Sequence, residues 1–545
     1  MFKRLLSHPG AIFAVVFAWK IVLFILSAQP VPANDSFYFD GPVVNLLLHG
    51  KYVNPSIALA MPISGTEVFS CYPPFYQLLL LPWMFVFGTS VLASIGFHLA
   101  LFGCYLLTLL AIFRRLNLPG WAGFIGGLFL FGISFHDRPD TLGELLGMLA
   151  VYAWIRSWSA AVPAAAGSFA EERRTGSSSL PPVARAAAWT AAPARWLWAM
   201  VGFVFLTFCT SLQLGVVYSL LIGMGALGAA VLGRQKFPFI PLLILFLLEV
   251  GLLALVAFGF PHLWAGLLEA GRQAPSIGGW RVPRPFELLR ILRTVPGVLG
   301  VIAYLPWLVG KHKKSVQAGC ERLWLVTVMC LFAALAILAA AMLYLADSVI
   351  WYASFLQPLL VGGALALTAA LYPGRRLLRI QLPVFLSLAA VSSVRAIGMT
   401  TWGLVCAADV GYPTAIERVR QEIRSCPRGQ TVAFSAAYLY EAARHDEIKW
   451  VHCNWLGRAE PHRPNAMRDA LVKVKPAKLI LSQLDYYYFY EPILEGLRPR
   501  SDLVSYQVRN AARVRTPDSM RLVRKVLHQV SWAPVIVDLR WNEVN

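Results

Sequence analysis

Two carboxylates lie close together in the polar segment that follows the first apolar run of the chain. Asp35 comes seven residues after that run, and Asp40 lies five residues further on. A positioned carboxylate can accept the proton of a hydroxyl group and so make its oxygen a better nucleophile. Asp35 is therefore our candidate for a general base and Asp40 is the alternative. The competing interpretation is that both side chains merely solvate a loop.

A second polar group follows a later apolar run, in the sequence His136-Asp137-Arg138-Pro139-Asp140. Asp140 could orient a polar substrate, and the guanidinium of Arg138 could contact phosphate. An alternative of equal weight is that these charges only end one span, with Asp140 favouring the start of the next helix.

A third group is basic and lies between residues 259 and 292. Its members are His262, Arg272, Arg281, Arg284 and Arg290. The predicted topology places this loop outside, against the usual bias of basic residues toward the cytoplasm. The position of these arginines therefore needs another explanation. Phosphate is a natural one, because the guanidinium fork binds its oxygens in pairs. Attraction to anionic headgroups is the alternative.

The composition indicates that the chain lies in a membrane. Of its 545 residues, 58% are hydrophobic and 14% are charged, and the mean hydropathy is +0.60. Soluble proteins carry roughly a quarter of charged residues. The net charge of +20 could suggest nucleic acid, but many basic residues sit in short loops beside apolar runs, which is typical of cytoplasmic loops. We therefore expect no nucleic acid among the partners.

Apolar runs of spanning length predict a mainly α-helical, polytopic bundle of about eleven spans. The expected spans are 11–28, 90–113, 121–135, 141–158, 196–213, 215–232, 238–258, 293–310, 322–346, 350–371 and 381–402. Lys3 and Arg4 place the N-terminus inside. Alternation then puts every short basic cluster but one on the cytoplasmic side, and it puts the C-terminus outside.

Two segments between these runs have a different character. In the outer loop 29–89, residues 74–88 are apolar but short and begin with proline, so we expect an interfacial helix on the outer surface. Residues 159–195 are rich in Ala, Pro, Ser and Arg and predict a flexible cytoplasmic linker.

Residues 411–545 read as a soluble α/β domain that follows the transmembrane domain 1–410. Thr414 and Glu417 form a capping box that opens a helix to about Ser425. Strands are expected at 431–435, 478–482, 503–508 and 534–539, with a helix at 466–475. The aromatic run 486–490 could stack on sugars, but we favour core and rim packing for it.

The first outer loop resembles that of the GT-C superfamily, the transferases that use polyprenyl-phosphate sugars, such as aminoarabinose transferases and protein O-mannosyltransferases. Their pattern is an Asp just after the first span, a Tyr three residues on, an amphipathic helix ending in a small residue, and a later segment like His-Pro-Pro-Leu-Tyr. The matching residues here are Asp35, Tyr38, Gly50 and Pro73-Pro74-Phe75-Tyr76. Ser36 and Tyr72 depart from it, because relatives usually have an acidic residue and often a His there.

The resemblance implies a membrane glycosyltransferase of the plasma (inner) membrane with a GT-C-like bundle. It would take a sugar from a polyprenyl-phosphate donor to a glycan, lipid or protein acceptor at the outer face, with inversion. Asp35, Asp40 and Asp140 are the catalytic candidates. The substrate-binding candidates are Tyr38, Tyr72, Tyr76, Arg138, His262, Arg272, Arg281 and Arg284. No cofactor is required by the pattern, and a divalent metal is left open.

Two other functions compete with this one. A lipid-linked-oligosaccharide ligase or polymerase would use a related donor. A transporter or flippase is suggested by Glu249 and Arg395, because charges within spans are costly and often functional. The sequence has no paired inverted repeats of the kind that many transporters have, which favours the transferase.

Overall fold

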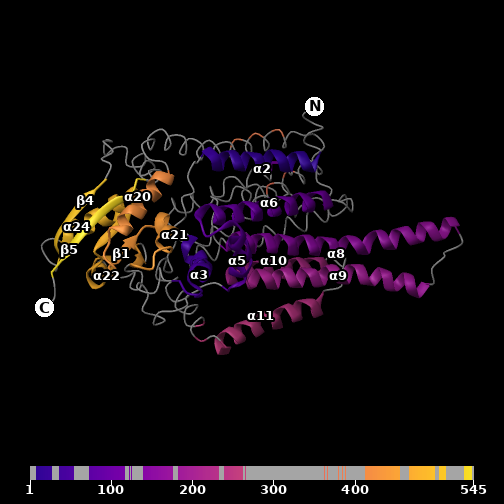
Figure 1. Ribbon diagram of the computed structural model, residues 1–545. Coiled ribbons are helices and arrows are strands. Elements are labelled where there is room, and N and C mark those ends of the chain that lie inside the picture. The colour runs from indigo at the N-terminus through magenta and orange to yellow at the C-terminus, as the bar shows by residue number, and fades with distance from the viewer. Residues whose placement is uncertain are drawn as a thin grey trace.

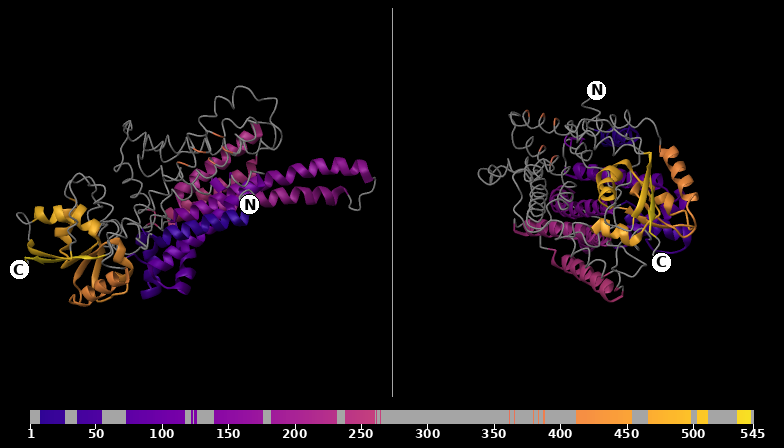
Figure 2. Two further views of the ribbon diagram at one scale, coloured as in Figure 1. Left: turned by 90° about the horizontal axis from the view of Figure 1, so that it is seen from above. Right: turned by 90° about the vertical axis from the view of Figure 1, so that its left-hand side faces the viewer.

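A bundle of long helices carries a small α/β domain at one end (Figures 1 and 2). The computed structural model describes residues 8–26, 36–54, 73–116, 139–175, 182–231, 238–259, 412–453, 466–497, 503–510 and 533–542, with a few isolated positions between 122 and 387. The part of the chain that is described is mostly helical with a C-terminal sheet, as the sequence predicted.

Six of the expected spans fall on described helices. The helices of the bundle are α2 (Pro9–Leu26), α3 (Ser36–His49), α5 (Phe75–Phe87), α6 (Val91–Arg115), α8 (Asp140–Thr175), α9 (Pro182–Phe208), α10 (Leu212–Val231) and α11 (Phe239–Gly259). The other five expected spans lie almost entirely outside the described residues. The number of spans stays a prediction.

Length and hydropathy suit a membrane span in two of the described helices, α6 and α11. Large apolar side chains such as Phe246, Leu247 and Phe258 are exposed along α11, as contact with lipid requires. The short helix α5 also exposes Phe85 and Val86 while it buries Tyr76 and Leu80. Such a two-sided helix fits the interfacial role that we predicted for residues 74–88.

The structure differs from the sequence prediction at residues 159–195. α8 continues to Thr175 and α9 begins at Pro182, so helices occupy most of the segment that we expected to be a flexible linker. The two helices run side by side as a long hairpin (Figure 1). Alanine has the highest helix propensity of all residues, and the segment is rich in it, which explains the difference.

Close packing of α8 on α10 depends on two glycines four residues apart. A Cβ added to Gly147 would lie 2.1 Å from Cε2 of Tyr218, and one added to Gly143 would lie 2.8 Å from Cδ1 of Leu214. Small residues at this spacing let helices in a membrane approach each other closely. This approach brings polar side chains of α8 and α10 into contact.

The described part of the C-terminal domain contains a five-stranded sheet in the order β2-β1-β3-β5-β4. The strands are β1 (Thr431–Phe434), β2 (Lys449–His452), β3 (Lys478–Leu481), β4 (Leu503–Arg509) and β5 (Val535–Trp541). β1 is parallel to β2 and β3, whereas β5 is antiparallel to β3 and β4. Four of these strands were predicted, and β2 was not.

The described helices of this domain are α20 (Tyr412–Arg424), α21 (Leu439–Ala442), α22 (Ala466–Val474), α23 (Gln483–Asp485) and α24 (Glu491–Leu497), with a 3-10 turn η2 (Ala436–Tyr438). The aromatic run forms the π-helix η4 (Tyr486–Tyr490). Tyr490 is fully buried and Phe489 is exposed, so the run supplies core and rim, as we favoured.

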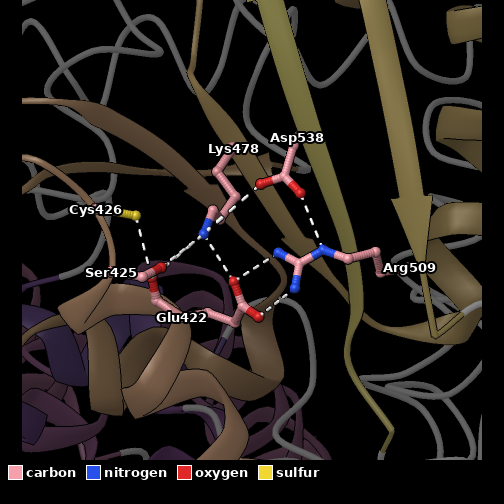
Figure 3. A network of polar contacts seen from close by, with 6 residues as sticks. All are labelled: Glu422, Ser425, Cys426, Lys478, Arg509 and Asp538. Carbon is pink, nitrogen blue, oxygen red and sulfur yellow. Dashed lines mark hydrogen bonds and ion pairs between the residues drawn. The ribbon is translucent and has the colours of Figure 1, made fainter.

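A network of charges fastens α20 to the sheet (Figure 3). Arg509 donates two hydrogen bonds of 2.8 Å to the carboxylate of Glu422, and Lys478 donates one of 2.7 Å. Arg509 also bonds Asp538 at 3.0 Å. Burial disfavours the charged form of Glu422, but the hydrogen bonds from Arg509 and Lys478 outweigh it, so the pKa of Glu422 is lowered. The network joins α20 to β3, β4 and β5.

Candidate functional site

The carboxylate of Asp40 is the centre of a buried cluster where the bundle meets the C-terminal domain. Ser94 and Tyr440 each donate a hydrogen bond of 2.5 Å to Oδ2, and Tyr76 donates one of 2.9 Å to Oδ1. Asp40 itself is 0% exposed. The donors come from α6, α21 and α5, so one side chain of α3 joins four helices.

α3 owes its position to the residues that follow it. Pro42 has no N–H group, so the carbonyl of Tyr38 loses its partner in the helix. Asn54 replaces that partner, because its Nδ2 donates to the Tyr38 carbonyl at 2.8 Å. The amide of Asn54 fits there because Gly41 has no side chain; a Cβ would lie 2.8 Å from Oδ1 of Asn54. Gly50, with φ +71°, then ends the helix, as the sequence pattern predicted.

A histidine extends the cluster along α6. The hydroxyl of Tyr76 has one proton, which it donates to Asp40, and its oxygen lies 2.9 Å from Nε2 of His98. Nε2 of His98 must therefore carry a proton and act as the donor in this contact. The result is a chain of hydrogen bonds from His98 through Tyr76 to Asp40.

The environment of Asp40 makes it easier to protonate than an ordinary aspartate. Desolvation by burial raises its pKa, and hydrogen bonds from Ser94, Tyr440 and Tyr76 lower it only in part, so that the pKa rises from 3.8 to about 6. A carboxylate of this pKa can hold or release a proton near neutral pH. Asp40 is enclosed on all sides. Its hydrogen bonds therefore hold helices together, and its carboxylate does not face a substrate.

Contacts on both sides of Asp40 form a domain seam. We use this term for Phe37, Asp40, His49 and Thr89 of the bundle together with Tyr440, Arg444, Asp446 and Trp450 of the C-terminal domain. The ring of Phe37 meets those of Tyr440 and Trp450 edge-on, with centroids 5.0 and 5.7 Å apart. Arg444 donates to the carbonyl of Thr89 at 3.0 Å.

His49 closes the seam at the end of α3. Its Nε2 lies 2.7 Å from the carbonyl oxygen of Ala443, and its Nδ1 lies 3.0 Å from Oδ1 of Asp446. His49 thus links the end of α3 to the residues that follow α21 in the C-terminal domain.

A second polar cluster lies between α8 and α10. Ser211 donates to Oδ1 of Asp140 at 3.2 Å, and Tyr218 donates to Oε2 of Glu144 at 2.9 Å. Asp140 and Glu144 are 6% and 1% exposed. One helical turn separates them, so both carboxylates lie on the face of α8 that packs on α10. Nearby, Ser219 of α10 donates to Glu249 of α11 at 2.7 Å.

The structure brings together only some of the predicted site residues. Asp40 and Tyr76 share one cluster, Tyr38 is buried in the same helix as Asp40, and Asp140 lies in the second cluster. The others lie outside the described residues: Asp35, Tyr72, Arg138, His262, Arg272, Arg281 and Arg284, with Arg290 and Arg395. Within the described part of the chain, no three His, Cys, Asp or Glu side chains could hold a metal ion together.

Sequence reasoning missed Ser94, His98, Tyr440, Glu144 and Tyr218. A carboxylate within an apolar run is a recognisable signal, so Glu144 could have been found. His98 lies in the first two turns of an apolar helix and gave a similar, weaker signal. Tyr440 gave none, because 400 residues separate it from its partner Asp40.

The helical bundle with an α/β domain at one end is a fold that solved structures share. No protein-family model matches the chain, and no curated protein matches it in sequence. The comparison therefore rests on solved structures, which show that the fold is shared.

ArnT from Cupriavidus metallidurans is among the similar structures. Its complex with undecaprenyl phosphate has a TM-score of 0.52 at 13% identity, over 96% of this chain and 97% of that one. Its apo structure has a TM-score of 0.51 at 14% identity, over the same shares of both chains. The apo oligosaccharyltransferase of Archaeoglobus fulgidus has a TM-score of 0.49 at 11% identity, over 90% of this chain and 71% of that one.

Proposed function

We propose that the chain is a membrane glycosyltransferase that moves a sugar from a polyprenyl phosphate to an acceptor at the outer face of the plasma (inner) membrane. The observation that carries the proposal is the shared fold with ArnT over nearly the whole of both chains, because that protein binds undecaprenyl phosphate. The pattern of the first outer loop supports it independently, since it was found in the sequence alone.

The reaction is a single displacement. The oxygen of an acceptor hydroxyl attacks the anomeric carbon of the sugar, and the bond from that carbon to the phosphate oxygen breaks. The phosphate leaves with the bonding electrons as polyprenyl phosphate, and Asp35 takes the proton of the hydroxyl. Attack from the side opposite the phosphate inverts the anomeric centre.

Asp35 is the better candidate for the base because it directly precedes α3, whereas Asp40 is enclosed within the domain seam. Arg272 and Arg281 are our candidates for contacts with the departing phosphate, whose charge grows as the bond breaks. Asp140 and Arg138 would act on the acceptor or the sugar. A divalent metal stays open, and no step here depends on one.

Binding of undecaprenyl phosphate tests the proposal. A ligand that binds the folded protein raises its melting temperature as the ligand concentration increases. We expect undecaprenyl phosphate to stabilise the purified chain and undecaprenol, which lacks the phosphate, to do so far less. Alanine at both Arg272 and Arg281 should reduce this difference. Equal stabilisation by the two lipids would contradict a phosphate site.

A further inference from the structure

The C-terminal domain meets the bundle through the carboxyl edge of its parallel strands. β1 ends at Phe434, and the chain continues through η2 into α21, which packs on α3. Figure 1 shows α21 between the sheet and α3. In open α/β sheets, functional groups gather at the carboxyl ends of the parallel strands. The edge of the sheet that usually carries function is thus the edge that faces Asp40.

Tyr440 is the residue through which this edge reaches the bundle. Its hydroxyl donates one of the two hydrogen bonds to Oδ2 of Asp40. Its ring packs edge-on against the ring of Phe37, which lies one turn before Asp40 in α3. Tyr440 is 3% exposed and Phe37 is 0% exposed. A hydroxyl of the C-terminal domain therefore completes a cluster whose other donors belong to the bundle.

The position of α21 is itself fixed by contacts with α20. Arg420 of α20 donates two hydrogen bonds to the carboxylate of Glu441, at 2.7 and 3.1 Å. Glu441 is the neighbour of Tyr440 in α21, and it is 7% exposed. α20 is in turn fastened to the sheet by Glu422 and its cationic partners (Figure 3). The sheet, α20 and α21 thus form a continuous support for Tyr440.

We propose that the C-terminal domain is a positioning element of the transferase, and that Tyr440, through Asp40, holds α3 so that Asp35 is aligned with the reacting hydroxyl. Asp35 is the residue immediately before Ser36, where α3 begins. Asp35 lies outside the described residues, but one peptide bond joins it to Ser36, so a displacement of the start of α3 also displaces its main chain. The inference rests on the proposed function, because it assigns the domain a part in the same reaction.

Tyr440→Phe is the sharpest change, because it removes one hydroxyl and keeps the ring against Phe37. Misplacement of a reacting group by about 1 Å can cost about 100-fold in rate, so we expect kcat to fall about 10- to 100-fold while KM for the donor stays nearly constant. The control is Tyr506→Phe. Tyr506 lies on β4, an edge strand that β3 and β5 separate from β1.

Two measurements on the full chain in detergent decide the inference. The first is the release of undecaprenyl phosphate from undecaprenyl-phosphate pentoses and hexoses, with cell-envelope lipids and glycans as acceptors. The second is hydrogen exchange of residues 36–49 by mass spectrometry, which needs no activity. We expect Tyr440→Phe to lower kcat and to speed exchange in α3, and Tyr506→Phe to change neither.

If α3 exchanges at the wild-type rate in Tyr440→Phe, the positioning role is wrong, whatever happens to kcat. If exchange rises and kcat is unchanged, the seam does not position the base and the inference is also overturned. If wild-type protein releases no undecaprenyl phosphate from any donor, the proposed function itself has failed. Arg420→Gln frees α21 without touching the Asp40 cluster; it should give the same pattern more weakly, and it replaces Tyr440→Phe if that variant does not fold.

Discussion

The carboxylate of Asp40 is buried among hydroxyl groups, and its protonation is therefore linked to folding. Its pKa is raised from 3.8 to about 6 in the folded protein, so the folded state binds the proton more tightly than the unfolded state. The stability from this side chain is fully present below about pH 4 and is lost as the pH rises through about 6. A shift of two units corresponds to roughly 3 kcal/mol.

Asp40→Asn isolates this contribution, because the amide cannot titrate in this range. The groups that face Asp40 are Ser94 and His98 of α6, the latter through Tyr76 of α5, and Tyr440 of α21. We expect the melting temperature of the wild type, minus that of Asp40→Asn, to decrease from about pH 4 to about pH 7. A difference that stays constant over this range would show that Asp40 does not titrate as its surroundings require.

At the residue scale, local signals predicted part of the cluster. The resemblance to GT-C transferases implied a helix that ends in a small residue at Gly50, and α3 is a helix that ends there. The partners of Asp40 could not be predicted, because Ser94 and Tyr440 come from elements that are distant in sequence. Periodicity says which face of a helix is buried, but it does not say which distant hydroxyl will meet it.

At the scale of elements, the packing of α8 on α10 leaves little room for an added methyl group. Gly147→Ala would place a methyl group against the ring of Tyr218, whose hydroxyl also bonds Glu144. We expect a loss of about 1–3 kcal/mol of stability, because overpacking forces a side chain or helix to move. The lower melting temperature of the purified variant would measure it.

Gly223→Ala is the matched control for Gly147→Ala. Gly223 lies in α10, and a Cβ there meets nothing within 4 Å. Alanine is a better helix former than glycine by about 1 kcal/mol, so this variant should be unchanged or slightly stabilised. Equal melting temperatures for the two variants would argue against close packing of α8 on α10.

Elements with strong periodicity were predicted well, and elements with mixed signals were not. β1, β3, β4 and β5 each have an apolar run of strand length, and the structure has a strand at each. Residues 159–195 contain both helix-favouring alanines and helix-breaking prolines, and composition alone pointed to a linker. Pro182 stands at the first position of α9, where proline is tolerated, so it starts a helix rather than breaks one.

At the scale of the whole molecule, the proposed chemistry requires the C-terminal domain and the first outer loop to lie on the same side of the membrane. The domain seam joins α3 to α21 directly, which is possible only for segments on one side. We expect a reporter fused after residue 545 to be active outside, and reporters near residues 175 and 312 to be active in the cytoplasm.

Reporters that work on opposite sides, such as alkaline phosphatase outside and a fluorescent protein inside, form a matched pair for each position. A cytoplasmic signal at residue 545 would refute the odd number of spans. A cytoplasmic signal at residue 545 together with an outer signal near residue 175 would show that the whole predicted topology is inverted.

The central claim is that Asp35 is the general base of a transfer from a polyprenyl-phosphate sugar. Asp35→Asn tests it most directly, because asparagine keeps the size and hydrogen bonding of the side chain but cannot accept a proton at neutral pH. The measurement is the release of undecaprenyl phosphate from undecaprenyl-phosphate sugars by the purified protein. A positioned base contributes about 100- to 10,000-fold in rate, so turnover should fall by that factor while the melting temperature and lipid-phosphate binding stay at wild-type values. Near-normal turnover in Asp35→Asn, with Asp40→Asn inactive but stably folded, would contradict the claim and make Asp40 the base.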